Sequence, residues 1–298
     1  MFNLKRRTKF EILLILIIIS RSTSFMFSKI TMDVMGPFTI LANRYFIAFF
    51  IMSIIYFKGM KNTDKNTFIK GIIIGAIYTA VMGLEMYGLK YTDSGTCSFL
   101  EHTAIVIVPF IQALLLKKFP EFKVIISSVI ALTGVGLLTL SAINNNINIG
   151  YVYCLLAAIV YAFAIIYTTD FSLKVKDSVA LGIWQVGFMG LFTFILAIFT
   201  EDIRLPHTTP EWFSILYLAI VCTCIGLTLQ PFAQSGTTAN RAALIAAFNP
   251  LSVAIIGVVL LHEKLTVTYV LGGILIIVAI LLSINSESSS VENNENKG

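Results

Sequence analysis

Five ionisable side chains fall inside long apolar runs of this sequence, and they are the residues best suited to bind or move a polar molecule. They are Arg21, Arg44, Glu85, Glu101 and His102. An ionisable group inside a membrane costs several kcal/mol unless it is paired or hydrated, so each is a candidate for function if these runs cross a bilayer. We expect Glu101, His102 and Glu85 to contact a polar or cationic group of a substrate. Arg44 or Arg21 would then hold a carboxylate or balance the acids.

A purely structural explanation of the same residues stays open. Arg44 would pair with one glutamate and Arg21 with the other, only to satisfy helix packing. His102 follows Glu101 directly and is therefore turned about 100° away from it on a helix. A single histidine is more often a hydrogen-bonded packing residue than a ligand.

Uncharged residues extend the set of candidates. Tyr78 precedes Glu85 by seven residues, so the two share one helix face. Four further residues could stack on a ligand or hydrogen-bond it: Tyr161, Trp184, Gln185 and Asn249. Pro109 and Pro250 interrupt apolar runs, where a kink frees backbone carbonyls and could provide a gating hinge. Packing of the aromatic residues and simple helix bending are the alternatives.

The composition predicts the elements that must position these side chains. The chain has 298 residues, of which 57% are hydrophobic and 12% are charged, against about 25% charged residues in an ordinary soluble domain. A transmembrane helix needs about 20 mostly apolar residues. The sequence therefore predicts an all-α polytopic membrane protein with ten spans, short loops and no soluble catalytic domain.

The apolar runs place these ten spans. We expect them near 10–30, 37–57, 69–90, 95–116, 123–142, 150–170, 178–200, 211–233, 240–261 and 267–284. The start of the chain resembles a signal peptide, but its apolar run continues to Ile30, which favours an uncleaved first span. Residues 1–9 are expected to form a cytoplasmic N-terminus, and the polar segment 285–298 a disordered cytoplasmic tail.

The distribution of basic residues predicts the orientation, because Lys- and Arg-rich loops stay on the cytoplasmic side. An inside N-terminus puts most of the 21 basic residues on inner segments. The outer segments then hold only Lys29, Lys90, Arg204 and Lys264. Both chain ends are therefore expected on the cytoplasmic side.

The two halves of the chain can be aligned with one another. Residues 91–96 open a span in the first half and residues 237–242 open one in the second, 146 positions later. This correspondence predicts two five-helix units, 10–142 and 150–284. Because five is an odd number of spans, the second unit must be inverted relative to the first, as in many secondary transporters.

Several other classes of protein find little support in the sequence. The formal charge of +5 comes from dispersed residues and not from a basic patch, which argues against a nucleic-acid partner. The three histidines and four cysteines show no metal-ligand spacing and no disulfide framework. No nucleotide-binding loop appears, so transport would run downhill, by exchange or on an ion gradient, without a cofactor. Enzyme activity is not expected, whereas a channel or a non-transporting membrane interaction protein stays an alternative.

The chain resembles the EamA-type branch of the drug/metabolite transporter superfamily over nearly its whole length. The matching stretches are Ser24–Lys29, Pro37–Arg44, Met86–Thr92, Gln234–Ile245, Asn249–Pro250 and His262–Thr266. The resemblance implies a ten-helix carrier with a central cavity, often an exporter of amino acids or other small metabolites. Two positions depart from the family pattern: Lys117 and Lys118 stand where an acidic residue usually ends the fourth span, and Asn249 stands where the ninth often has glutamate.

These observations together predict a secondary transporter for a small polar metabolite, an amino acid or a related compound, which it exports across a bacterial cytoplasmic membrane. Its expected partners are the lipid bilayer and a small-molecule substrate. The residues Gly71 and Gly75 form a small-xxx-small pattern that lets helices approach closely. The pattern indicates either packing within the chain or contact in a homodimer.

Overall fold

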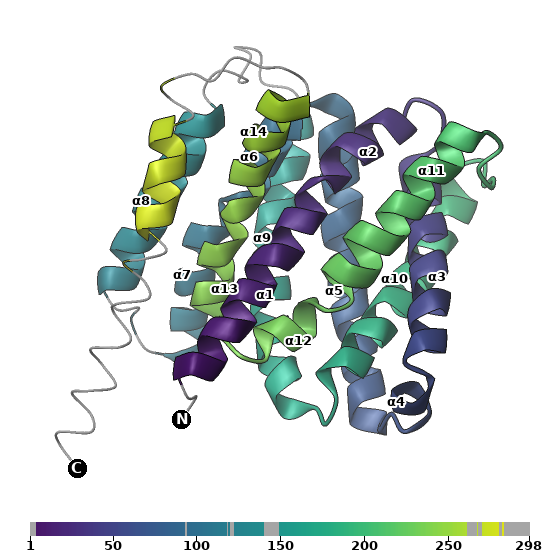
Figure 1. Ribbon diagram of the computed structural model, residues 1–298, viewed down its shortest axis with the longest axis horizontal. Coiled ribbons are helices and arrows are strands. Elements are labelled where there is room, and N and C mark those ends of the chain that lie inside the picture. Colours follow the sequence, from purple (N-terminus) through teal and green to yellow (C-terminus); the bar gives the residue numbers. More distant parts are fainter. Residues whose placement is uncertain are drawn as a thin grey trace.

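The structure is a computed structural model that describes residues 4–92, 94–117, 119, 122–139, 149–260, 267, 270–279 and 282. Within these ranges the regular elements are all helices, which confirms the all-α prediction (Figure 1). The helices are α1 (Leu4–Ser22), α2 (Ser24–Thr31), α3 (Pro37–Ile55), α4 (Phe57–Lys61), α5 (Lys65–Tyr91), α6 (Ser94–His102), α7 (Ala104–Leu116), α8 (Phe122–Thr139), α9 (Ile149–Lys174), α10 (Ser178–Thr200), α11 (Thr209–Tyr217), the π-helix η1 (Leu218–Leu227), α12 (Gln230–Gln234), α13 (Ala239–Ala246) and α14 (Phe248–Leu260).

Seven segments of the described chain are long and apolar enough to cross a membrane. They are Arg7–Thr31, Pro37–Ile55, Lys65–Tyr91, Ser94–Leu115, Ile149–Lys174, Ser178–Thr200 and Thr209–Gln234. Two shorter apolar helices, Phe122–Leu137 and Val270–Ala279, fall where further spans were expected. The ends of the expected spans 123–142, 240–261 and 267–284 lie outside the described residues, as does the expected tail 285–298.

The bundle has two edges, which Figure 1 shows as its lower and upper margins. The chain begins at the lower one, here called the N-terminal edge, where α4 and α12 also lie. The end of α2 and the start of α11 lie at the opposite edge. Between them, α1 packs against η1, α12, α13 and α14, while α9 packs against α5, α6 and α7. Helix α10 contacts both α3 and α5. Helices from distant parts of the sequence therefore converge on one interior.

Two aspartates help to start helices at the N-terminal edge. Asp177 accepts hydrogen bonds from the amides of Val179 and Ala180 at the start of α10, as an N-cap residue does. It also accepts a bond from the Tyr56 hydroxyl at 2.9 Å, and this bond raises the pKa of Tyr56. At the start of α5, the Thr67 hydroxyl donates to Asp64 and lowers the pKa of that carboxyl group. The Tyr56–Asp177 and Thr67–Asp64 bonds both stabilise helix ends that lie outside the apolar spans.

Three apolar runs of the described chain break into two helices partway along. The first long segment breaks at Thr23 and the fourth at Thr103, where each hydroxyl donates to the carbonyl three residues earlier, Ser20 O and Leu100 O. Such local side-chain bonds compete with the regular backbone hydrogen bonds of an α-helix. Helix α13 ends and α14 begins around Ala247. Pro250 explains this break, because its ring excludes the carbonyl four residues earlier from the α-helical position. The expected gating role of Pro109 and Pro250 stays a prediction.

The small residues of α5 bring it close to α10. A methyl group on Gly71 would lie 2.6 Å from Trp184 Cβ, and one on Gly75 would lie 2.8 Å from Phe188 Cβ. Real Cβ contacts are not this short, so glycine is required at both positions. The Gly71–Gly75 pattern thus serves packing within the chain.

We expect Gly75→Ala to destabilise the protein, because the added methyl group must push two well-packed helix backbones apart. Overpacking of this kind costs about 1–3 kcal/mol. Thermal unfolding of the purified protein in detergent measures the effect. Gly136→Ala is the matched control, because a methyl group there meets only Phe99 ring atoms at 3.8 Å or more. Equal midpoints for the two variants would contradict the packing argument.

Candidate functional site

A chain of hydrogen bonds joins three helices inside the bundle. Arg21 Nη1 in α1 donates to Gln230 Oε1 of α12 at 2.7 Å, and Gln230 Nε2 donates to the Tyr78 hydroxyl of α5 at 2.8 Å. Gln230 and Tyr78 are both buried. Gly226 makes this arrangement possible, because a methyl group there would lie 2.6 Å from Arg21 Cγ. Arg21 is thereby held in the interior by neutral partners.

Tyr161 of α9 extends the polar cluster. Its side chain is hydrogen-bonded to Arg21, and its ring meets those of Tyr78 and His102 edge to face at 6.4 Å and 5.8 Å. His102 Nδ1 lies 2.7 Å from Ser98 O. A carbonyl only accepts, so Nδ1 bears the proton and Nε2 is left as an acceptor. Nε2 has no hydrogen-bond partner among the described residues.

Two carboxyl groups meet in the same region. Glu85 of α5 and Glu101 of α6 are hydrogen-bonded to each other, and Arg21 interacts electrostatically with both. Glu101 is only 2% exposed, and its Oε2 atom has no partner within the described part of the chain. A buried polar atom without a partner is costly, so the ligand-binding role expected of Glu101 stays a prediction that this open hydrogen-bonding position favours.

Arg44 approaches the acids from α3. Its Nε donates to Thr223 Oγ1 at 3.1 Å, and its guanidinium acts electrostatically on Glu85. Thr223 lies in the π-helix η1 and donates its own hydroxyl proton to Leu218 O. Within the described part of the chain, Arg21 and Arg44 thus hydrogen-bond to neutral partners and not directly to a carboxylate. This arrangement differs from the simple arginine–glutamate pairing considered as the structural alternative.

Seven of the predicted residues therefore form one group, named here the central cluster: Arg21, Arg44, Tyr78, Glu85, Glu101, His102 and Tyr161. Gln185 is also buried, and neither of its amide atoms has a partner among the described residues. Asn249 Oδ1 in α14 is likewise buried and has no partner among the described residues. Trp184 is different, because its ring packs against Phe49, Phe68 and Phe188.

The sequence did not single out Gln230 and Thr223, although both bond directly to arginines of the central cluster. Neutral polar residues are common in membrane spans, and only the meeting of α12 with α1 and α5 gives Gln230 its role. One available signal was the Gln230–Pro231 pair inside an otherwise apolar run.

An ionic group was also missed at the N-terminal edge. Glu11 Oε1 accepts bonds from Arg241 Nη1 at 2.6 Å, Thr237 Oγ1 at 3.1 Å and Arg7 Nε at 3.2 Å. The side chains of Glu11 and Arg241 are only 10% and 6% exposed. This group ties α1 to the segment that begins α13.

A second acidic residue ties helices together at the opposite edge. The Glu201 carboxylate accepts bonds from the amides of Phe38 and Thr39, both at 2.9 Å, and from the Thr39 hydroxyl. The start of a helix presents free amide groups, which favour an anion. Glu201 therefore fixes the end of α10 to the start of α3.

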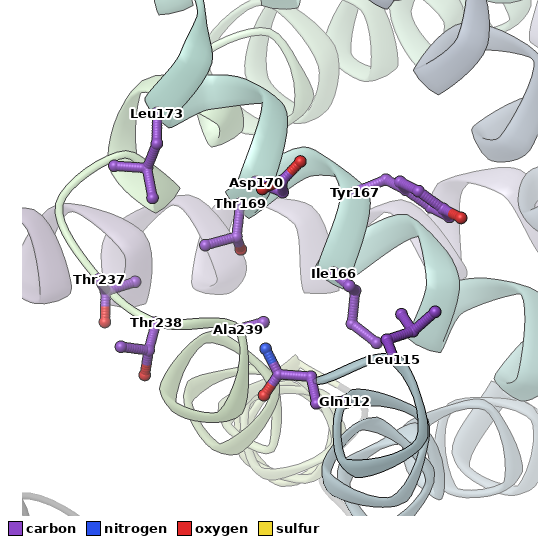
Figure 2. Close-up of a pocket in the computed structure, with 10 residues that line it drawn as sticks. All are labelled: Gln112, Leu115, Ile166, Tyr167, Thr169, Asp170, Leu173, Thr237, Thr238 and Ala239. Carbon is purple, nitrogen blue, oxygen red and sulfur yellow. The ribbon is translucent and has the colours of Figure 1, made fainter. Parts of the chain in front are cut away.

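A pocket of about 400 Å³ opens beside the ionic group, between α7, α9 and the segment that leads into α13 (Figure 2). Its walls combine apolar side chains with polar ones such as Gln112, Asp170 and Thr238. Thr169 in its wall donates to Gln234 Oε1 at 3.5 Å. Helix α9 lines this pocket and also contributes Tyr161 to the central cluster.

Comparison with known proteins gives one consistent result. The model of the EamA-like transporter family matches the chain twice, over residues 8–140 and 148–285. An "Uncharacterized transporter" of Archaeoglobus fulgidus is 27% identical over 85% of this chain and 79% of its own length. The "Uncharacterized transporter YvbV" of Bacillus subtilis is 25% identical over 71% of this chain and 70% of its own. A solved crystal structure superposes with a TM-score of 0.75 over 93% of this chain and 96% of its own, at 13% identity, which shows a shared fold.

Proposed function

Because the chain belongs to the EamA-like transporter family, we propose that it is a secondary transporter that exports a small polar metabolite, an amino acid or a related compound, by alternating access. The observation that supports this proposal most is the central cluster. It places two arginines and two glutamates in the interior of an apolar bundle, with a carboxylate oxygen of Glu101 left without a partner among the described residues. Ionisable groups in such a place are candidates for function by default, because they are costly unless paired or hydrated.

The chemistry of the cluster suits a molecule that carries both a positive and a negative charge. The Glu85–Glu101 pair can accept hydrogen bonds from an ammonium group, and Arg21 or Arg44 can donate to a carboxylate. Tyr161 is hydrogen-bonded to Arg21, and Tyr78 to Gln230, so both offer hydroxyl and ring contacts beside these groups. Zwitterionic amino acids have this distribution of charge.

The helix contacts support two inverted five-helix units, 10–142 and 150–284. In that arrangement α1 corresponds to α9, and the α11–α12 span corresponds to α5. The packing of α1 on η1 then has its counterpart in the packing of α9 on α5. The packing of α1 on α13 and α14 likewise corresponds to that of α9 on α6 and α7. Units related in this way can open a shared site to either side.

The basic residues support a cytoplasmic N-terminal edge in a bacterial cytoplasmic membrane, with both chain ends inside. The pocket beside Thr238 would then be the inner approach to the central cluster. Transport would run by exchange or on an ion gradient.

Counterflow in proteoliposomes tests the proposal. Vesicles loaded with one unlabelled amino acid, amine or nucleotide-derived metabolite should accumulate the same labelled compound transiently. The uptake should be saturable, because alternating access binds substrate in each cycle. Flux without saturation, together with single-channel conductance in a planar bilayer, would favour a channel. Absence of flux for the whole panel would favour an interaction protein.

A further inference from the structure

Two cysteine side chains from different helices meet near the edge opposite the N-terminus. Cys97 lies in the first turn of α6 and Cys154 lies five residues into α9, and their Sγ atoms are 3.3 Å apart. Both are free thiols and both are fully buried. The sequence indicated no such contact, because the residues are 57 positions apart and only the packing of α9 on α6 brings them together.

The surrounding structure makes room for this thiol pair. A methyl group on Gly88 of α5 would lie 2.5 Å from Cys154 Sγ and 3.5 Å from Cys97 Sγ. Glycine therefore leaves the space that the two sulfur atoms occupy. The Cys97 thiol also donates to Glu85 O at 3.6 Å. The pair thus lies against the backbone of a residue of the central cluster.

The same two helices contribute side chains to that cluster. Glu101 follows Cys97 by one turn of α6, and Tyr161 follows Cys154 by two turns of α9. A covalent bond between the sulfur atoms would therefore fix the spacing of Glu101 and Tyr161.

The thiol pair has a counterpart at the N-terminal edge. Under the proposed repeat, α6 corresponds to α13 and α9 corresponds to α1, and Arg241 corresponds to Gly95, two residues before Cys97. The Glu11–Arg241 ion pair joins α1 to α13, as the thiol pair joins α9 to α6. Each pair connects one helix of the first unit to one of the second, and the two pairs lie at opposite edges. Under the proposed alternating access, each pair therefore spans a contact that separates when its own side opens.

We propose that Cys97 and Cys154 form a redox-sensitive lock at the outer side of the transporter. Oxidation of the two thiols to a disulfide holds α6 against α9 and stops transport. This inference rests on the proposed function, because a lock requires a contact that opens in each cycle.

The oxidant is a low-molecular-weight disulfide in the outer solution. One protein thiolate attacks it when the outer side opens, which forms a mixed disulfide and releases one small thiol. On closure the second protein thiolate displaces the other small thiol. The protein thiols are oxidised with loss of two hydrogens, and the small disulfide is reduced to two thiols.

The test uses the full chain in proteoliposomes, as a Cys222→Ser, Cys224→Ser variant that retains Cys97 and Cys154 alone. Bis(2-hydroxyethyl) disulfide is added outside, and non-reduced proteolytic fragments are examined by mass spectrometry. We expect a fragment pair joined through Cys97 and Cys154 and a loss of counterflow of at least about tenfold. A reducing agent should restore the counterflow. The further variant Cys154→Ala cannot form the bond and should keep its transport in the presence of the oxidant.

Each other outcome has a distinct meaning. Absence of the joined fragments overturns the thiol site. Joined fragments with unchanged counterflow overturn the lock. If the unoxidised protein transports no compound of the panel, the proposed function fails and the lock fails with it, although the joined fragments can still form.

Discussion

Replacing Glu101 with glutamine should abolish transport and leave the amount of folded protein in the membrane unchanged. Glutamine has nearly the same shape as glutamate, so the packing of α6 against α9 is kept. Glu85 and Glu101 share one proton through their hydrogen bond. The glutamine amide can neither release this proton nor offer a carboxylate to a cationic group of the substrate. Truncating one partner of a buried, hydrogen-bonded charge pair costs about 2–5 kcal/mol. Since about 1.4 kcal/mol corresponds to tenfold, we expect a loss of roughly 30-fold or more.

Counterflow with the substrate found in the panel measures this loss, normalised to the protein inserted. Asp202→Asn is the matched control, because Asp202 is an exposed acid in the segment between α10 and α11. It should transport at the unaltered rate. Full activity of the Glu101→Gln variant would refute the role of the central cluster in binding.

Replacing Glu11 with alanine should strongly destabilise the fold. Glu11 accepts hydrogen bonds from Arg241, Arg7 and Thr237, and its pair with Arg241 is almost fully buried. Removing one partner of a buried ion pair leaves the other charge uncompensated, at a cost of about 3–5 kcal/mol. Thermal unfolding of the purified protein measures the change.

Lys174→Ala provides the comparison for Glu11. Lys174 pairs with Asp170 at 2.7 Å, but the two side chains are 61% and 43% exposed. Exposed pairs contribute little because water screens them, so the midpoint should barely move. A double-mutant cycle of Glu11→Ala with Arg241→Ala isolates the coupling between the two charges. A coupling energy near zero would show that the ion pair does not join α1 to α13 energetically.

The sequence was sufficient to predict an all-helical chain with many apolar spans, of which the described residues contain seven. Apolar runs of about 20 residues have few alternatives in a chain of this composition. The same reasoning found Arg21, Arg44, Glu85 and Glu101, since a charge within such a run is costly in any arrangement of helices. The expectation that these four side chains lie in the interior of the bundle follows from the cost of a charge within an apolar run.

Other features depend on which helices meet, and the sequence could not supply this. Gly71 and Gly75 predicted a close helix contact but not that α10 is the partner. The ligand-binding role of Trp184 stays a prediction, and its ring contacts with Phe49 and Phe68, which come from two other helices, could not be read from the sequence. Glu11 lies near the end of its span, where an acid does not by itself indicate a role. Its role becomes clear only from the contact with Arg241 in the structure.

The central cluster has a consequence for the electrical behaviour of the protein. While Glu85 and Glu101 share a proton through their hydrogen bond, the cluster carries one net positive charge. When a bound substrate replaces this hydrogen bond and both acids are ionised, the formal charges of Arg21 and Arg44 cancel those of Glu85 and Glu101. A site in this state has no net charge when it holds a zwitterion. It can change its exposure from one side of the membrane to the other without moving charge through the electric field of the membrane. The membrane voltage then does no work on that step. A substrate with one net charge would instead experience about 2.3 kcal/mol for every 100 mV, so voltage would drive its movement in one direction.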